Sequence, residues 1–252
     1  SLDGMGYIIL RKDKSFAEQV TQANTIYEVR YDFDLAGVEV EIPNNCILKF
    51  NGGKLSNAIL VGDMTRILYD GTIFSQVTIK GSWNIPNIYD DIFDFNSMTE
   101  DNSLRNLFAL TNPSVQNNVF IDSYDYYISL TDQSSNYIGV SINSNTKVII
   151  NKTIFLRAST LSLYSIIRIN DAENVVIDGS GQIIGESLIH TGSGGEWGFG
   201  IEVAGDSANV TISGLTIKNC WGDSIYINAK GNIDIDNCVL YGSRRQGISV
   251  TN

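Results

Sequence analysis

The residues best suited to chemistry gather near the end of the chain, between positions 186 and 246. They combine carboxylates, one imidazole, aromatic rings and guanidinium groups. Aromatic rings can stack on sugar rings, arginine forks pair with carboxylates, and a carboxylate or an imidazole can move a proton. This combination predicts a glycan site. The candidate catalytic residues are Asp223, Glu196, His190, Arg244 and Arg245, and the candidate substrate-binding residues are Trp197, Trp221, Phe199, Gln246 and Glu186.

These residue types fit two kinds of reaction and one kind of binding. In a hydrolase, Asp223 and Glu196 would act as acid and base, and their separation would set retention or inversion of configuration. In a lyase or epimerase acting on a uronate, Arg244 or Arg245 would neutralise the substrate carboxylate while His190 removes the neighbouring proton. A non-catalytic glycan-binding module would use the same aromatic residues without needing Asp223.

A repeat of 23 to 24 residues positions these side chains. Strands centred on Ile201, Ile225 and Ile248 follow one another at spacings of 24 and 23 residues, and the segments "NVTI" at Val210 and "NIDI" at Ile233 recur 23 residues apart. A repeat of this length cannot bury its apolar face alone, so copies must stack. The pattern predicts an all-β fold, a parallel β-helix. The alternative is a β-sandwich, which also has short strands and polar turns.

Stacking places side chains from successive repeats in columns about 4.8 Å apart. The columns directly before the strands should form one continuous lateral surface. An insertion, Glu186 to Gly198, should lie against that surface and bring its own carboxylates and the single histidine. One predicted column holds Trp197, Trp221 and Arg244, and another holds Phe199, Asp223 and Gln246.

Two helices are predicted outside the repeats. Ser15 and Glu18 form a capping-box pattern that should open a short helix ending near Asn24. A second helix should follow a cap at Thr99 or Asp101. The chain ends directly after the strand at Ile248, so we expect the β-helix to be truncated there. The predicted division is an N-terminal leader (1–30), an N-terminal β module (31–95), a helical connection (96–136) and the β-helix (137–252).

Composition limits the possible partners. The chain has 252 residues and a formal net charge of −11, with 18 acidic and 9 basic residues in 1–136 but 10 and 8 in 137–252. Nucleic acid needs a basic surface, which this sequence lacks. The three cysteines have no metal-binding spacing, so we expect no metal and no cofactor. No apolar stretch is long enough for a membrane span, and we expect an extracellular, periplasmic or virion-surface location with the signal peptide outside this sequence.

The segments "GGEWGFGIEV", "NCWGDSIYI" and "GSRRQGISV" resemble the pectate-lyase-like superfamily of right-handed parallel β-helices over roughly residues 140–252. That superfamily includes pectate lyases, polygalacturonases, mannuronan epimerases and phage tailspikes. Gly222-Asp223 is similar to the glycine-aspartate pair of polygalacturonases, and "GSRRQGISV" is similar to an epimerase turn that carries histidine where this chain has Gln246. The N-terminal segment resembles a leader found before β-helices of gut Bacteroidetes and their phages.

The resemblance implies a polysaccharide partner, and a monomer or a homotrimer. The expected function is a polysaccharide lyase, epimerase or glycoside hydrolase. The alternative is a non-catalytic glycan-binding or structural module, such as a tailspike or adhesin segment. The chain lacks the additional adjacent aspartates and the Gly-His-Gly turn of polygalacturonases. It also has only Asp223 on the proposed surface, where pectate lyases cluster aspartates around calcium.

Overall fold

The strands pair in parallel throughout the residues that the computed structural model describes, 4–130 and 137–251. A β-sandwich of hairpins would pair antiparallel strands, so this alternative is wrong. Contacts divide the chain into an N-terminal unit, residues 1–115, and a C-terminal unit, residues 116–252.

The N-terminal unit is built from parallel strands and short helices. Its long strand β6 pairs with β3, β4, β5 and β7, so successive segments stack beside one another. The strands are β1 (Gly6–Ile9), β2 (Thr25–Val29), β3 (Phe33–Asp34), β4 (Glu39–Glu41), β5 (Ile47–Phe50), β6 (Leu55–Leu68), β7 (Phe74–Trp83) and β8 (Asn87–Tyr89). The helices are α1 (Phe16–Gln19), η1 (Asp90–Ile92), η2 (Phe95–Ser97) and α2 (Glu100–Ala109).

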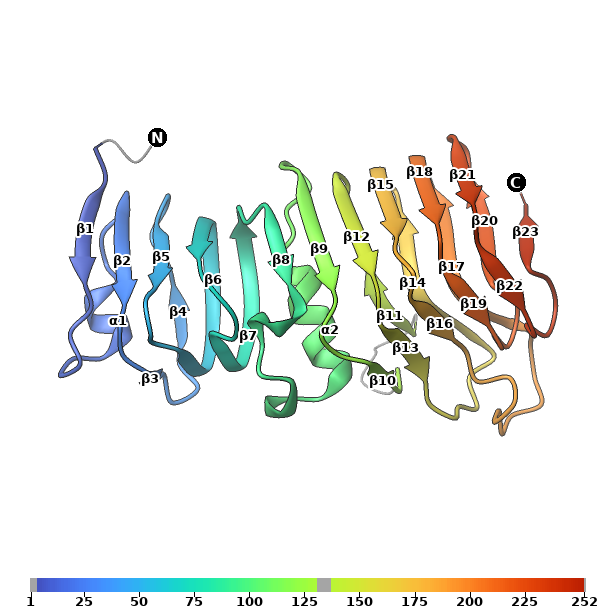
Figure 1. Ribbon diagram of the computed structural model, residues 1–252, viewed down its shortest axis with the longest axis horizontal. Coiled ribbons are helices and arrows are strands. Elements are labelled where there is room, and N and C mark those ends of the chain that lie inside the picture. Colours follow the sequence, from blue (N-terminus) through green and yellow to red (C-terminus); the bar gives the residue numbers. More distant parts are fainter. Residues whose placement is uncertain (1–3, 131–136, 252) are drawn as a thin grey trace. The chain divides into compact units, whose positions relative to one another are not determined.

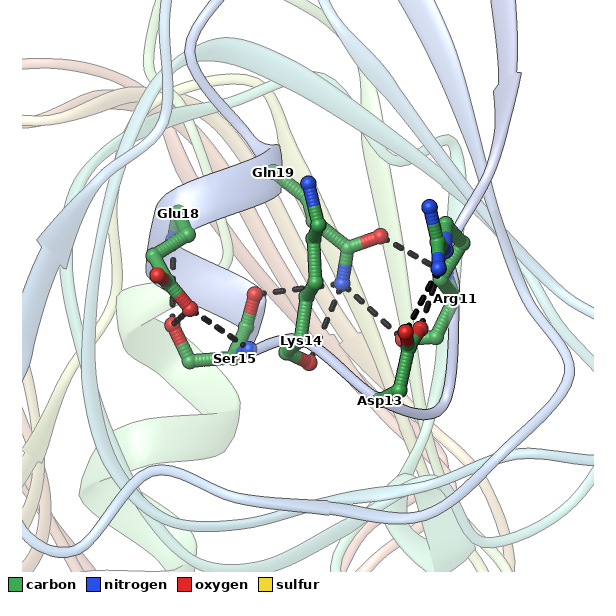
Figure 2. Close-up of polar contacts among 6 residues, drawn as sticks. All are labelled: Arg11, Asp13, Lys14, Ser15, Glu18 and Gln19. Atoms are coloured by element: carbon green, nitrogen blue, oxygen red, sulfur yellow. Dashed lines mark hydrogen bonds and ion pairs between the residues drawn. The ribbon is translucent and has the colours of Figure 1, made fainter.

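The capping box of α1 forms as predicted, but the helix is shorter. Ser15 Oγ accepts a hydrogen bond from the Glu18 N–H at 3.2 Å, and Glu18 Oε2 accepts one from the Ser15 N–H at 3.0 Å (Figure 2). The helix ends at Gln19 and does not reach Asn24. Beyond it, the Asn24 N–H donates to the Asn44 carbonyl, because stacking on the neighbouring segment satisfies this backbone better than another helical turn.

Helix α2 begins where the sequence predicted. Thr99 is its N-cap, since Thr99 Oγ1 accepts a hydrogen bond from the Asn102 N–H at 3.2 Å. Asp101, the alternative cap, lies inside the first turn and pairs with Arg105 at 3.4 Å. The helix lies within the predicted connection 96–136, of which residues 131–136 fall outside the described chain.

The C-terminal unit is a parallel β-helix whose coils contribute strands to three sheets. The sheets have the orders β10-β13-β16-β19-β22, β11-β14-β17-β20-β23 and β9-β12-β15-β18-β21 (Figure 1). Strands β9 and β10 already belong to these sheets, so the coil begins earlier than residue 137. The strands are β9 (Asn117–Ile121), β10 (Tyr126–Ile128), β11 (Ile138–Ser141), β12 (Thr146–Ile150), β13 (Thr153–Leu156), β14 (Leu163–Asn170), β15 (Glu173–Asp178), β16 (Gln182–Ile184), β17 (Trp197–Gly205), β18 (Ala208–Ser213), β19 (Thr216–Lys218), β20 (Ile225–Ala229), β21 (Ile233–Asp236), β22 (Val239–Tyr241) and β23 (Ile248–Val250).

The register of these strands confirms the predicted repeat. Ile201 pairs with Ile225, and Ile225 pairs with Ile248. Val210 likewise pairs with Ile233. Ile201 and Ile225 are fully buried and line the interior of the coil. The insertion leaves the coil after β16 and returns at β17, so it separates two strands that belong to different sheets.

A ladder of asparagines fixes one corner of the β-helix. Asn145, Asn174 and Asn209 all have left-handed backbone conformations, with φ of 58°, 57° and 53°. Asn174 Nδ2 donates to Asn145 Oδ1 at 3.1 Å, and Asn209 Nδ2 donates to Asn174 Oδ1 at 2.5 Å. Asparagine tolerates this conformation better than most residues, so one side chain serves both the turn and the stacking.

Replacing the central member of the ladder should destabilise the protein. The variant Asn174→Ala loses both side-chain hydrogen bonds and places alanine in a left-handed conformation, which together should lower the free energy of unfolding by about 2 kcal/mol. Urea denaturation measures this change. The matched control is Asn232→Ala, an exposed residue two coils further on in the same column, which should change the free energy by less than about 0.5 kcal/mol. Equal effects of the two substitutions would show that the ladder does not stabilise the coil.

Candidate functional site

The first turn of the insertion, Glu186 to His190, is held against the coil by backbone hydrogen bonds on both sides. The Ser187 N–H donates to the Asn219 carbonyl at 2.9 Å, and the Thr191 N–H donates to the Ser159 carbonyl at 3.0 Å. The Ile189 N–H donates to the Glu186 carbonyl at 3.0 Å and closes a turn between these two anchors. The insertion therefore packs on the neighbouring coils, and its first turn has a defined inner and outer side.

Glu186 and His190 form a buried pair on the inner side of that turn. His190 Nδ1 lies 3.0 and 2.9 Å from the two Glu186 carboxyl oxygens. The Glu186 side chain is 0% exposed and the His190 side chain 1%. Burial raises the pKa of the Glu186 carboxyl, and the hydrogen bond with His190 acts in the opposite direction. His190 Nε2 is also buried and makes no hydrogen bond within the described residues. The pair is therefore sealed from solvent.

Trp221 lies between His190 and Arg244. The imidazole is stacked on the indole with centroids 3.5 Å apart and planes 11° apart, and the Arg244 guanidinium carbon lies 3.9 Å from the ring. Two groups this close cannot share one face of the indole, so they occupy opposite faces. Arg244 also pairs with Glu196 at 3.1 Å. The fold thus links Glu186, His190, Trp221, Arg244 and Glu196 in one series of contacts, in which only Arg244 and Glu196 are substantially exposed.

Asp223 lies inside the turn and not on the exposed surface that its column predicted. Its side chain is 0% exposed, Oδ1 accepts a hydrogen bond from the Gln246 N–H at 3.0 Å, and Arg245 Nε lies 4.0 Å away. Asp223 Oδ2 is buried and makes no hydrogen bond within the described residues. The predicted alignment of this repeat with its neighbours was right. The tight turn at Gly222, however, directs the Asp223 carboxylate toward the backbone of the next coil.

The other predicted site residues point in different directions. Phe199 is buried and stacks on Tyr226, with centroids 4.4 Å apart, and not on the neighbours in its predicted column. Trp197 pairs with Leu163 at the start of β17 and is 51% exposed, whereas Trp221 is 8% exposed. The predicted continuous surface is therefore wrong at Trp221, Asp223 and Phe199. Trp221 and Asp223 lie in a turn, where side chains do not follow the alternation of a strand, and Phe199 lies in β17 but is buried.

An open groove beside the insertion was missed by the sequence analysis. Outward-facing side chains of three paired strands form its floor: Tyr127 on β10, Phe155 on β13 and Ile184 on β16. The rings of Tyr127 and Phe155 are stacked in parallel, 4.4 Å apart and 4° from coplanar. We call this site the aromatic groove; its volume is about 570 Å³. The residues that line it are Tyr127, Phe155, Leu156, Arg157, Ala158, Ile184, Gly185, Leu188, Ile189 and Asn219.

Arg157 and the insertion complete the aromatic groove. The Arg157 guanidinium carbon lies 5.3 Å from the Tyr127 ring. Leu188 and Ile189, from the outer side of the insertion turn, are 78% and 54% exposed. A sequence signal existed, because Tyr127, Phe155 and Ile184 are spaced 28 and 29 residues apart. This spacing differs from the later repeat of 23 to 24 residues and so did not stand out.

The buried thiol near this site should be chemically inert. Burial raises the pKa of Cys220 to about 12, so roughly one thiol in ten thousand is ionised at pH 8. We expect iodoacetamide at pH 8 to leave Cys220 unmodified in the native protein, as measured by peptide mass spectrometry, while the partly exposed Cys238 reacts first. In urea all three cysteines should react. Rapid native labelling of Cys220 would contradict this burial.

Within residues 4–130 and 137–251, no three His, Cys, Asp or Glu side chains are grouped so that they could hold a metal ion. No helix in this described part of the chain is long and apolar enough to cross a membrane.

The C-terminal unit is a right-handed parallel β-helix. The family model described as "Right handed beta helix region" matches residues 199–252, the part in which the repeat is most regular. This finding and the parallel sheets confirm the fold class that the sequence predicted.

Two known proteins are similar to this chain. The uncharacterized SPβ prophage-derived protein YorA of Bacillus subtilis (strain 168) is 37% identical over 115 residues. That match covers 42% of this chain and 19% of YorA, so the chain spans about a fifth of the length of this relative. The crystal structure of a protein from Parabacteroides merdae, described as a candidate glycosyl hydrolase, superposes with a TM-score of 0.52 at 16% identity. It covers 65% of this chain and 81% of its own, and at this identity the likeness concerns the fold alone.

Proposed function

We propose that the C-terminal unit binds a polysaccharide in the aromatic groove. The observation that carries this proposal is the parallel stack of Tyr127 and Phe155 on the floor of an open groove, with Arg157 beside it. Ligand sites are concave, mostly apolar and aromatic, and contain a few polar groups that orient the ligand. A sugar ring has an apolar C–H face that can stack on such a floor and hydroxyl groups that a guanidinium can bind. The groove offers both kinds of contact.

Binding without turnover is favoured over catalysis by the state of the candidate acids and bases. Glu196 is paired with Arg244, Asp223 is buried, and His190 is sealed with Glu186. A general acid or base must reach the substrate at hydrogen-bond distance, which the buried Asp223 and His190 do not offer in this conformation. Glu196 is exposed, but it is paired with Arg244, and hydrolysis needs a second carboxylate that also reaches the substrate. The proposed function is therefore that of a glycan-binding β-helix. The likeness to a prophage-derived protein favours a virion surface as its location.

A binding and turnover assay tests this proposal. The protein is titrated by calorimetry with a panel of neutral and uronate-containing polysaccharides, while reducing ends and the absorbance of unsaturated products are followed. Binding to at least one polysaccharide without product formation is the expected result. Absence of binding to every member of a broad panel would overturn the proposal. Product formation would instead assign a lyase or hydrolase activity, and Glu196→Gln and Asp223→Asn would then show whether these carboxylates take part.

A further inference from the structure

The first turn of the insertion has one buried face and one face in the aromatic groove. Glu186 and His190 begin and end the turn with side chains that are 0% and 1% exposed. Between them, Leu188 and Ile189 point outward, are 78% and 54% exposed, and line the groove. The same five residues therefore contact the interior of the coil on one side and form a wall of the groove on the other.

The buried face is anchored more firmly than the exposed one. His190 Nδ1 is hydrogen-bonded to the Glu186 carboxyl group, and the imidazole ring is stacked on Trp221 with centroids 3.5 Å apart. Trp221 is fixed in turn, because its backbone N–H donates to Tyr164 Oη at 2.9 Å and Arg244 covers its other face. Leu188 and Ile189 are among the large apolar side chains left exposed to solvent. The wall is therefore held from its buried side by the contacts of His190, in addition to the backbone hydrogen bonds of the turn.

We infer that the Glu186–His190 pair is a positioning clamp for the Leu188–Ile189 wall and thereby sets glycan affinity without touching the glycan. This inference rests on the proposed function of the groove. Loss of the clamp leaves the turn held only by the backbone hydrogen bonds of Ser187, Ile189 and Thr191. The wall is then less ordered and must be ordered again when the ligand binds, and that ordering costs affinity. The role is one of position, since both clamp side chains are sealed from the groove side by the turn itself.

The clamp can be examined without any ligand. Trp221 is buried beneath His190, so the variant His190→Ala should make tryptophan fluorescence more accessible to acrylamide. Trp83, which is buried, and Trp197, which is already exposed, provide a constant background. The control is Ser193→Ala, an exposed residue in the same insertion. If His190→Ala does not fold, His190→Gln serves in its place, because it keeps a hydrogen-bond donor for Glu186 but removes the ring from Trp221. Unchanged quenching in the variant would overturn the clamp.

A double-mutant cycle then tests whether the clamp acts through the wall. Leu188→Ala and His190→Ala should each weaken binding of the polysaccharide found in the panel by roughly tenfold. Because both act through the same wall, His190→Ala should cost less than about twofold when Leu188 is already alanine. Full tenfold losses in both backgrounds would overturn the clamp. If Leu188→Ala weakens binding and His190→Ala does not, the clamp fails while the groove stands. If the wild-type protein binds no polysaccharide but His190→Ala still increases acrylamide quenching, the proposed groove function fails. The Glu186–His190 pair then orders the turn but sets no glycan affinity.

Discussion

Replacing Tyr127 with alanine should weaken polysaccharide binding by about 30-fold. Truncating an aromatic residue at the centre of a binding site typically costs about 2 kcal/mol, which corresponds to this factor. The variant removes half of the stacked floor and leaves Phe155 without its parallel partner. Calorimetry with the polysaccharide identified by the panel measures the change. Stability should be little affected, since Tyr127 is exposed on the outer side of β10.

Tyr241→Ala is a closely matched control for this prediction. Tyr241 lies in the same outward column, is similarly exposed, and has Lys218 Nζ 5.5 Å from its ring, as Tyr127 has Arg157 at 5.3 Å. It does not line the aromatic groove. Binding should stay within about twofold of the wild type for this variant. If both tyrosine variants lose the same affinity, the ligand contacts the whole outer face and the groove is not the site.

Replacing Trp221 with alanine should lower the free energy of unfolding by about 3 to 5 kcal/mol. The substitution removes a buried indole and leaves a cavity in its place. It also removes the stacking contacts that the indole makes with His190 and Arg244. Chemical denaturation with urea measures this loss. Trp197→Ala is the control, because Trp197 is exposed and its removal should cost less than about 1 kcal/mol. Similar small losses for both variants would mean that the insertion packs loosely in solution.

The sequence was sufficient for the parts of the fold that depend on apolar spacing. Ile201, Ile225 and Ile248 must face the interior of successive coils, so their spacing determines both the strand phase and the stacking. The capping pattern at Ser15 was equally readable, because it depends on two side chains within one turn. The length of α1 was not, since the chain beyond Gln19 is held by a distant carbonyl at Asn44.

The site was less predictable than the fold, for a physical reason. In a strand, side-chain direction follows from position, but in a glycine turn it depends on local dihedral angles. Asp223 was therefore placed in the right column and yet on the wrong side of the surface. Tyr127 and Phe155 lie in strands and could have been paired by their outward phase. Their spacing of 28 residues was hidden by the shorter repeat that follows.

The outward column Tyr127, Phe155, Ile184, Lys218 and Tyr241 runs across five consecutive coils in unbroken register. Each member projects away from the packed interior, so its identity can change without repacking the coil. Two substitutions, at Ile184 and Lys218, are enough to convert the column into a continuous aromatic track. If the groove binds a glycan as proposed, the scaffold allows the length of the bound oligosaccharide to be adjusted one coil at a time, with specificity and folding encoded at separate positions.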